Sequence, residues 1–269
     1  PARLRAAGAP RLEVRLNKVL FESRGEIAYV TINRPERLNA CDFDTYERLA
    51  QCWERFRDDP TLRVAILSGS GERAFCVGSD IKANYGEGRA EREPPNRLFP
   101  VLATMTKPIL VAINGHCNGG GLEQALACDI RVAAAHAQFG LGEVLLGLLP
   151  GGGGTQRLPR LIPRGRALEL LYTGARIDAD EALRLGLVDH VVPASELMAK
   201  CEAIAAAILR GAPLAVEKIR EAVMRGRDLP LAAGLAIERD LFEYLRGTAD
   251  AVEGAAAFAA KRPPRWQGR

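Results

Sequence analysis

A glycine-rich turn between an apolar strand and a helix is the feature that most constrains the fold. In "KPILVAINGHCNGGGLEQALACDI" (107–130), the chain turns through "HCN" and three glycines into an alanine-rich helix whose first turn carries Glu123. Glycine loses the most conformational freedom on folding, so three together need a reason. A tight turn with close helix packing is one. The other is that the N–H groups opening a helix lack intrahelical partners and bind negative charge, with Gly120 the best-placed donor.

Short apolar strands alternate with helices along the first two thirds of the chain. An amphipathic helix with Leu49, Trp53 and Phe56 on one face follows the N-cap candidate Asp42, and two later helices (166–173 and 179–185) are each closed by a glycine. This alternation predicts an α/β fold with parallel pairing. The strands that we expect are a hairpin formed by 12–25 with 27–33, then 63–69, 107–115, 129–135 and 187–193.

A second glycine turn follows the strand at 63–69. The segment "ERAFCVGSDIK" (72–82) again sets a glycine, Gly78, before a helical start, with Ser79 and Asp80 as capping residues. Two such turns after two strands of one sheet could direct two N–H donors at one oxygen. That is the geometry of an oxyanion hole, which stabilises a developing enolate or tetrahedral oxygen by several kcal/mol.

Two glutamates stand in apolar surroundings 20 residues apart, at Glu123 and Glu143. An unpaired carboxylate is costly there, so each could simply pair with a surface arginine. The functional alternative is a pair of carboxylates that flank a water or a substrate carbon and are tuned for acid/base work. The nearby "GGGGTQR" (151–157) lacks the Lys-[ST] ending of a phosphate-binding P-loop.

Charge and cysteine usage exclude several classes. The net charge of +4 comes from dispersed basic residues, which argues against nucleic acid. No apolar run has the length of a membrane span, and neither the cysteines nor the three histidines have metal-ligand spacing. The six cysteines have mostly apolar neighbours, so we expect buried, reduced thiols of a cytoplasmic protein.

The two ends of the chain and one internal segment differ from the strand-and-helix pattern. From about Ala194 the chain reads as helices with long apolar stripes, which must bury a face against the body or another subunit. The polar stretch 84–96 is expected to be a surface loop of the kind that often gates a site. The first ten residues lack the apolar core of a secretion signal and are expected to form a tail.

Several ordered motifs resemble the enoyl-CoA hydratase/isomerase, or crotonase, family over nearly the whole chain. They are "IAYVTINRPERLNA" (27–40), "AFCVGSDIK" (74–82), "KPILVAINGHCNGGGLEQALACDIRVAA" (107–134), "FGLGEVLLGLLPGGGGTQRLPRLI" (139–162) and "LYTGARIDADEALRLGLVDHVVP" (171–193). The resemblance implies the crotonase spiral of ββα units over residues 1–200 and a C-terminal helical oligomerisation region over 201–269, with trimers that can pair into hexamers.

The resemblance also implies roles for residues. Glu123 would activate a water and Glu143 would deliver the proton to the α-carbon, while the N–H groups of Ser79 and Gly120 hold the thioester oxygen. Gly151 would line the water site. The remaining substrate-binding positions, near the thioester or the nucleotide end of CoA, are Asn39, Ala40, Gly78, Asp80, Ile81, Lys82 and Gly119.

The implied activity is enoyl-CoA hydratase, the reversible syn addition of water to a trans-2-enoyl-CoA in fatty-acid or related acyl-CoA degradation. Coenzyme A enters as part of the substrate, and no metal or other cofactor is expected. Family members that isomerise usually lack one glutamate, whereas carnitinyl-CoA dehydratases keep both, so these reactions remain alternatives, as does a silent or RNA-binding member. "GHCN" (115–118) and Gly142 depart from the family pattern, which leaves the acyl-chain preference open.

Overall fold

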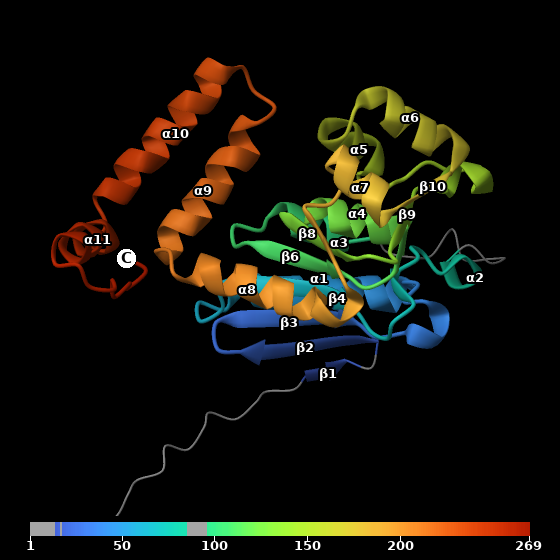
Figure 1. Cartoon of the computed structure of the whole chain (residues 1–269), viewed down its shortest axis with the longest axis horizontal. Helices are drawn as coiled ribbons and strands as arrows, with labels where there is room; N and C mark the ends of the chain where they lie inside the picture. Colours follow the sequence, from blue (N-terminus) through green and yellow to red (C-terminus); the bar gives the residue numbers. More distant parts are fainter. Residues whose placement is uncertain (1–13, 17, 85–95) are drawn as a thin grey trace, which may run out of the picture.

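The computed structural model describes residues 14–16, 18–84 and 96–269. Figure 1 shows a body of two sheets with covering helices, and an arm of helices that extends from it. The expected N-terminal tail and nearly all of the expected loop at 84–96 lie outside the described residues.

The larger sheet confirms the strands expected from the sequence. Its order is β1-β2-β3-β4-β6-β8-β11, antiparallel from β1 to β3 and parallel from β3 to β11. The predicted hairpin is therefore present, and so is the parallel pairing. The bounds are β1 (Val14–Leu16), β2 (Val19–Arg24), β3 (Ile27–Ile32), β4 (Val64–Gly69), β6 (Ile109–Ile113), β8 (Ile130–Ala134) and β11 (His190–Val192).

The smaller sheet was not expected. Its order is β10-β9-β7-β5, with β5, β7 and β9 parallel and β10 antiparallel to β9. The prediction that "HCN" is only a turn is wrong, since these residues form β7. Strands of three residues are too short to show a period of two, so only their pairing reveals them. The bounds are β5 (Ala74–Cys76), β7 (His116–Asn118), β9 (Gln138–Gly140) and β10 (Arg176–Asp178).

The chain winds as a spiral of repeated strand–strand–helix units. Each unit places one strand in the larger sheet and the next in the smaller sheet, as β4 with β5, β6 with β7, and β8 with β9. The helix or turn that follows is α2 (Ile81–Asn84), α4 (Gly120–Ala127) or the 3-10 turn η2 (Glu143–Leu146). Because β5, β7 and β9 are parallel neighbours, the segments that follow them meet at one edge of the smaller sheet.

The central strands of the larger sheet, such as β4 and β6, are mostly apolar because both faces of the sheet are covered there. In β4, Ala65 and Leu67 belong to the main core, whereas Val64 and Ile66 pack in a second core with α8 (Leu197–Leu209). Successive side chains of a strand point to opposite faces, so burial of both faces removes the usual polar alternation.

Helices of the body bury one face each against these cores. The helix predicted after Asp42 is α1 (Phe43–Asp58), and the Asp42 carboxylate accepts a hydrogen bond from the Thr45 amide, as expected of an N-cap. The two glycine-closed helices are α6 (Arg164–Thr173) and α7 (Ala179–Leu185), each ended by a left-handed glycine. Between the site and α6 lies α5 (Gly154–Leu161), and α3 (Leu98–Ala103) packs against α1 and α4.

The C-terminal third is helical, as expected, and splits into two parts. The helix α8 packs on the larger sheet although it spans the predicted domain limit at residue 200. The next helices leave the body as a C-terminal arm: α9 (Pro213–Gly226), α10 (Leu231–Arg246) and α11 (Ala249–Ala259) (Figure 1). In the described part of the chain, no helix is long and apolar enough to cross a membrane.

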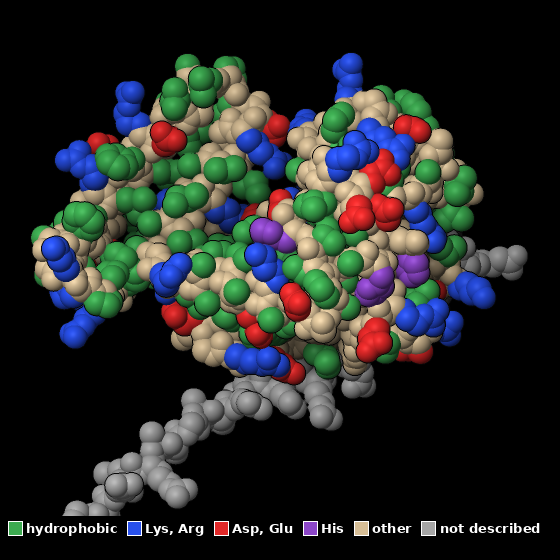
Figure 2. All heavy atoms as spheres, in the orientation of Figure 1, with side chains coloured by type: hydrophobic (Ala, Val, Ile, Leu, Met, Phe, Trp, Pro, Cys, Tyr) green, Lys and Arg blue, Asp and Glu red, His purple; other side chains and the backbone are tan. Residues whose placement is uncertain are grey.

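Apolar side chains remain uncovered on the C-terminal arm, as Figure 2 shows over α9–α11. Among them Leu235 is 47% and Phe242 59% exposed. A groove of about 640 Å³ lies between the arm and the body, lined by residues of α5, α8 and α9 that include Leu161, Ile219 and Val223. The body therefore has a closed core, whereas the arm does not.

Candidate active site

The turns after β5 and β7 are pressed together where the two strands end. A Cβ added to Gly78 would lie 2.9 Å from the amide nitrogen of Gly120, and one added to Gly120 would lie 2.7 Å from the Tyr46 hydroxyl. Gly78 also has φ +98°, which favours glycine. Glycine at positions 78 and 120 thus allows the two turns to lie in contact. This explains why a glycine stands before the helix at each of these positions.

The amides of Ser79 and Gly120 open into the same space. Within the described residues neither N–H donates a hydrogen bond to the protein, whereas the neighbouring amides of Asp80 and Gly119 do. A Cβ built on Gly120 would lie 3.9 Å from the Ser79 nitrogen, so the two donors flank one small volume. This arrangement suits a single acceptor oxygen.

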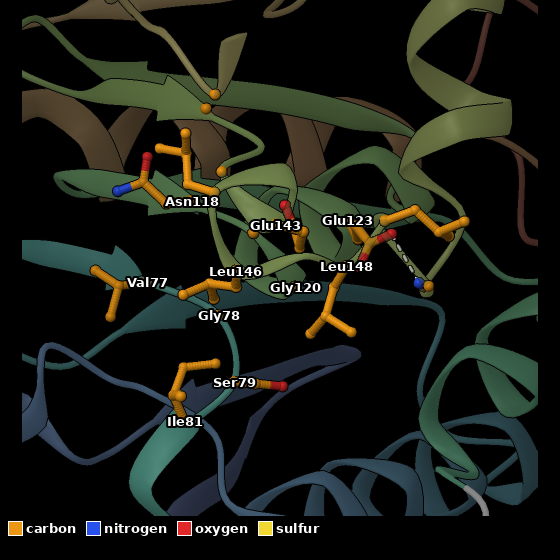
Figure 3. A pocket seen from close by; sticks show the side chains of 18 of the residues that line it. Val77, Gly78, Ser79, Ile81, Asn118, Gly120, Glu123, Glu143, Leu146 and Leu148 are labelled. Atoms are coloured by element: carbon orange, nitrogen blue, oxygen red, sulfur yellow. Dashed lines mark hydrogen bonds between the residues drawn. The ribbon is translucent and has the colours of Figure 1, made fainter. Parts of the chain in front are cut away.

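Glu123 is held by main-chain donors at the start of α5. Its side chain lies on α4 and the residue is only 3% exposed; Oε1 accepts hydrogen bonds from the amides of Gly152 at 2.7 Å and Gly154 at 2.8 Å, one of which is dashed in Figure 3. Burial raises the pKa of this carboxyl, while the hydrogen bonds from the two amides act against that rise. A Cβ on Gly152 would lie 2.7 Å from Glu123 Oε2, so glycine there allows the contact. The alternative prediction, that Glu123 pairs with a surface arginine, is wrong, because its carboxylate accepts from main-chain amides instead.

Glu143 differs, since within the described residues the one main-chain donor that lowers its pKa is its own amide. It opens η2 after β9, and its Oε2 is buried without a hydrogen-bond partner among the described residues. Its Oε1 would lie 3.2 Å from a Cβ on Gly119, which places the carboxyl beside the glycine turn. Burial raises the pKa of Glu143, and repulsion from Glu123 adds to the rise. The two carboxyls therefore interact, and burial shifts the pKa of each toward the neutral form.

One cavity of about 720 Å³ contains both glutamates and both amides (Figure 3). Its walls also include Tyr46, whose hydroxyl lies 3.1 Å from the Ser79 hydroxyl, and leucines of the segment after Glu143. Of the predicted site residues, those that line it are Gly78, Ser79, Ile81, Gly119, Gly120, Glu123, Glu143 and Gly151.

Four predicted residues lie outside that lining. Asn39 is fully buried, and its side chain accepts from the Arg34 amide and donates to the carbonyls of Ser70 and Ala74, so it holds the local turn. Ala40 is almost buried beside it. Asp80 pairs with Arg34 at 3.1 Å and also accepts from the Ala83 amide in α2. Lys82 is exposed on the outer side of that helix. Contacts of these four with a nucleotide stay predictions.

Sequence reasoning missed several functional groups of the site. "GGGG" at 151–154 was compared with phosphate-binding loops, and Gly151 was assigned to the water site, but neither expectation included the hydrogen bonds that Gly152 and Gly154 donate to Glu123. The sequence does place a glutamate in apolar surroundings about 30 residues before this glycine run. Only the folded structure shows that the two segments are in contact. Tyr46 and Arg176 gave no signal, although both line the cavity. Asn118 was noted only as part of the departure from the family pattern at 115–118, and it lines the cavity as well.

No metal site accompanies these groups. In residues 14–16, 18–84 and 96–269, no group of three or more His, Cys, Asp or Glu side chains could hold a metal ion. All six cysteines are buried and free, as expected from their apolar neighbours. The cavity itself offers two N–H donors and two carboxyls.

Comparisons with known proteins agree with this arrangement. Residues 22–269 match the family described as enoyl-CoA hydratase/isomerase. (E)-benzylidenesuccinyl-CoA hydratase of Thauera aromatica is 42% identical over 93% of this chain and 99% of its own. Short-chain-enoyl-CoA hydratase of Clostridium acetobutylicum is 42% identical over 92% of this chain and 96% of its own. The crystal structure of enoyl-CoA hydratase from Bacillus anthracis has a TM-score of 0.87 and 37% identity, covering 94% of this chain and 100% of that one.

Proposed function

This chain belongs to the enoyl-CoA hydratase/isomerase family, and from that premise we propose how its site works. It has the crotonase fold and is an enzyme of the hydro-lyase class, an enoyl-CoA hydratase or a close crotonase-family alternative. Its reaction is the reversible syn addition of water to a trans-2-enoyl-CoA, which gives a 3-hydroxyacyl-CoA. The observation that carries the mechanism is the meeting of two unpartnered amides and two unlike carboxyls in one cavity.

The amides of Ser79 and Gly120 hold the thioester oxygen. When water adds to the β-carbon, negative charge moves onto this oxygen as an enolate, and two preorganised donors stabilise it. Their support is that neither amide has a protein acceptor in the described residues and that both border the cavity. The Tyr46 hydroxyl, 3.1 Å from Ser79 Oγ, orients the Ser79 side of the pair.

The two carboxyls divide the proton transfers. Glu123 receives two main-chain hydrogen bonds, which favour its charged form, so it takes a proton from the attacking water. Glu143 receives no hydrogen bond from the amide of another described residue, and burial and repulsion from Glu123 raise its pKa, so in this proposal it starts protonated and delivers its proton to the α-carbon. In the reverse direction the roles exchange. Gly151, at the cavity wall where an added Cβ would meet nothing, leaves room for the water.

The nucleotide end of CoA lies toward Asp80, Ile81 and Lys82 in this proposal, with Asn39 and Ala40 behind them. Ile81 lines the cavity while Lys82 is exposed beyond it, so the segment runs from the reaction space to solvent. Water and the thioester supply every atom of the reaction, so we propose no metal and no redox cofactor. Fatty-acid or related acyl-CoA degradation in the cytoplasm is the proposed setting, for which the six free thiols are the support.

The C-terminal arm builds a homo-oligomer, a trimer or a dimer of trimers. Its support is the uncovered apolar faces of α10 and α11 and the open groove beside α9. Patches of this kind on a soluble protein usually mark an interface. Size-exclusion chromatography with light scattering measures the number of subunits, and a monomer at micromolar concentration would contradict the assembly.

The test of the function uses crotonyl-CoA and wild-type protein without added cofactor. The absorbance of the conjugated thioester should fall as water adds, and 3-hydroxybutyryl-CoA should accumulate to equilibrium. If crotonyl-CoA and medium-chain 2-enoyl-CoAs are inert while a 3-enoyl-CoA or carnitinyl-CoA reacts, the alternative isomerase or dehydratase activity replaces hydration. If CoA thioesters bind but none reacts, the silent alternative holds.

A further inference from the structure

A row of three residues crosses the smaller sheet at the cavity and has no role in the mechanism above. Asn118 of β7 is paired with Gly140 of β9, and Gly140 is paired with Arg176 of β10. Paired residues of neighbouring strands point to the same face of a sheet. All three also line the cavity that holds Glu123 and Glu143. We call these three residues the polar row.

The centre of the polar row is empty because Gly140 has no side chain. A Cβ added to Gly140 would lie 3.1 Å from Cγ of Arg176 and 3.4 Å from Oδ1 of Asn118. The two long side chains therefore border the same small space from opposite sides. Any residue larger than glycine would fill the space that they share.

The polar groups of the row lack protein partners. Asn118 is 9% exposed, and its side-chain oxygen Oδ1 is buried without a hydrogen-bond partner. Its side-chain nitrogen Nδ2 has no acceptor within the described residues. Leaving a buried amide unpaired is costly, so such a group needs an explanation. The guanidinium of Arg176 is also without an ion-pair partner in the part of the chain that the structure describes.

The polar row adjoins Glu143 rather than the CoA side. Gly119 follows Asn118 directly, and a Cβ on Gly119 would lie 3.2 Å from Glu143 Oε1. In Figure 3, Asn118 lies above Ser79 and Ile81, with Val77 and Gly78 between them. In the proposed function the nucleotide end of CoA lies toward Ile81 and Lys82, and Glu143 protonates the α-carbon. The polar row, which adjoins Glu143, is then on the acyl side of a thioester held at Ser79 and Gly120.

We propose that the polar row recognises a carboxylate on the acyl group, so that the preferred substrates are CoA monothioesters of 2-enedioic acids. The idea rests on the proposed function, whose thioester site fixes the direction of the acyl group. A guanidinium binds a carboxylate with two parallel hydrogen bonds, and the Asn118 amide, turned by half a rotation about χ2, donates a third. Leu145 and Leu146 of η2 line the same cavity and contact the methylene groups between the double bond and the carboxylate.

The test compares substrates of equal length that differ only at the end of the acyl group. We expect wild-type protein to have a higher kcat/KM for trans-2-hexenedioyl-CoA than for trans-2-hexenoyl-CoA. Arg176→Gln should lower the ratio of these two kcat/KM values by about 10-fold to 100-fold, the effect of losing a hydrogen bond to a charged group. Asn118→Ala should lower the ratio less, and Arg176→Lys should restore part of it because the charge remains.

Binding of saturated thioesters tests the inference without any turnover. Adipoyl-CoA and hexanoyl-CoA have no double bond to hydrate, so calorimetric titration of both measures recognition alone. Gln138→Ala is the matched control, since Gln138 is exposed on the same face of β9 but lies outside the cavity lining. This variant should keep the wild-type ratio of the two affinities.

Three results would overturn the inference and leave hydration itself intact. The first is a wild-type preference for the methyl-ended thioesters in both assays. The second is an Arg176→Gln variant that weakens both thioesters equally, which would make Arg176 a structural residue. The third is equal preference for a hydroxyl-ended and a carboxylate-ended thioester, which would mean that polarity rather than charge is read. Failure of the proposed function gives a different result, since crotonyl-CoA then stays unhydrated while adipoyl-CoA still binds more tightly than hexanoyl-CoA.

Discussion

The helices α1 and α10 both have 16 residues but differ in how much of their apolar face is buried. In α1, seven residues are buried, including Leu49, Trp53 and Phe56, which pack under the larger sheet. In α10 no residue is buried, although Leu231, Leu235 and Phe242 are as apolar. Full burial of such a side chain stabilises the folded state by about 1.5–3 kcal/mol. The apolar side chains of α1 contribute this stabilisation, and those of α10 do not.

This contrast separates the tasks of the two regions. The body has a complete core and holds every residue of the cavity, whereas the C-terminal arm has apolar surface that nothing in the described residues covers. Chemistry should therefore depend on the body and assembly on the arm. The experiments below test that division, beginning with the largest expected effect.

Removing the carboxyls should stop the chemistry and leave assembly intact. Glu123→Gln and Glu143→Gln should each lower kcat by about 10²–10⁴-fold, because Gln keeps the shape but cannot exchange a proton. The double variant should be far less than multiplicatively worse, since both groups act on one water. The measurement is hydration of crotonyl-CoA, with subunit number followed by light scattering.

A Glu→Gln substitution in the C-terminal arm is the control for the two active-site variants. Glu238→Gln changes an exposed glutamate of α10 and should leave turnover within a factor of two. If Glu143→Gln alone proves harmless, the water is not held between two carboxyls and the mechanism fails.

Loss of one oxyanion donor should have the next largest effect. Gly120→Pro removes an amide N–H and should lower kcat by about 10²-fold or more. A Cβ at residue 120 also meets the Tyr46 hydroxyl, so the two effects need separating. In a Tyr46→Phe background, Gly120→Ala keeps the N–H without the clash and should retain far more activity than Gly120→Pro. Equal activity of the two variants would mean that Gly120 is not a donor.

Changes in the arm should alter assembly first. Deleting residues 230–269, or changing Leu235 and Phe242 to Asp, should give a smaller or insoluble species in size-exclusion chromatography. Arg246→Gln on the same helix disturbs only an exposed ion pair with Glu243, worth about 0–1 kcal/mol, and should leave the subunit number unchanged. A soluble truncated protein with the full number of subunits and full activity would break the division between body and arm.

The buried carboxylate of Glu143 is also expected to lower the free energy of unfolding at neutral pH. Burial raises the pKa of Glu143, so the folded protein holds that proton more tightly than the unfolded chain. The group's contribution is thus favourable below pH 4.5 and is lost as pH rises through the folded pKa. Glu143→Gln should therefore raise the Tm by roughly 1–3 °C at pH 7 and by less at pH 4. Calorimetry checks this, and an equal gain at both pH values would rule out the carboxylate as its cause.

The smallest effect is expected at the surface of the body, at Lys82. An exposed ion pair with a phosphate of CoA is worth about 0–1 kcal/mol, so Lys82→Ala should raise KM up to about fivefold and hardly change kcat. Steady-state kinetics separates the two constants. A large fall in kcat with unchanged KM would place Lys82 in the chemistry instead.

The sequence identified groups that line the cavity better than it identified the sheet that aligns them. Gly78, Ser79, Gly120 and both glutamates were found because glycine before a helix and acid among leucines violate ordinary preferences. The three-residue strands of the smaller sheet violate nothing and went undetected. Yet it is the pairing of β5, β7 and β9 that brings the turns after them together.

By itself the sequence determined the order of elements, the apolar faces and the residues able to do acid/base work, because these depend on composition and periodicity along the chain. Only the tertiary structure decided what each group meets. It gave Glu123 two amide donors from a glycine run about 30 residues later and left Oε2 of Glu143 buried without a partner in the described residues. It also aligned Asn118 and Arg176 across Gly140. Ionisation and recognition depend on neighbours in space, and contacts between distant segments are set by packing rather than by local sequence.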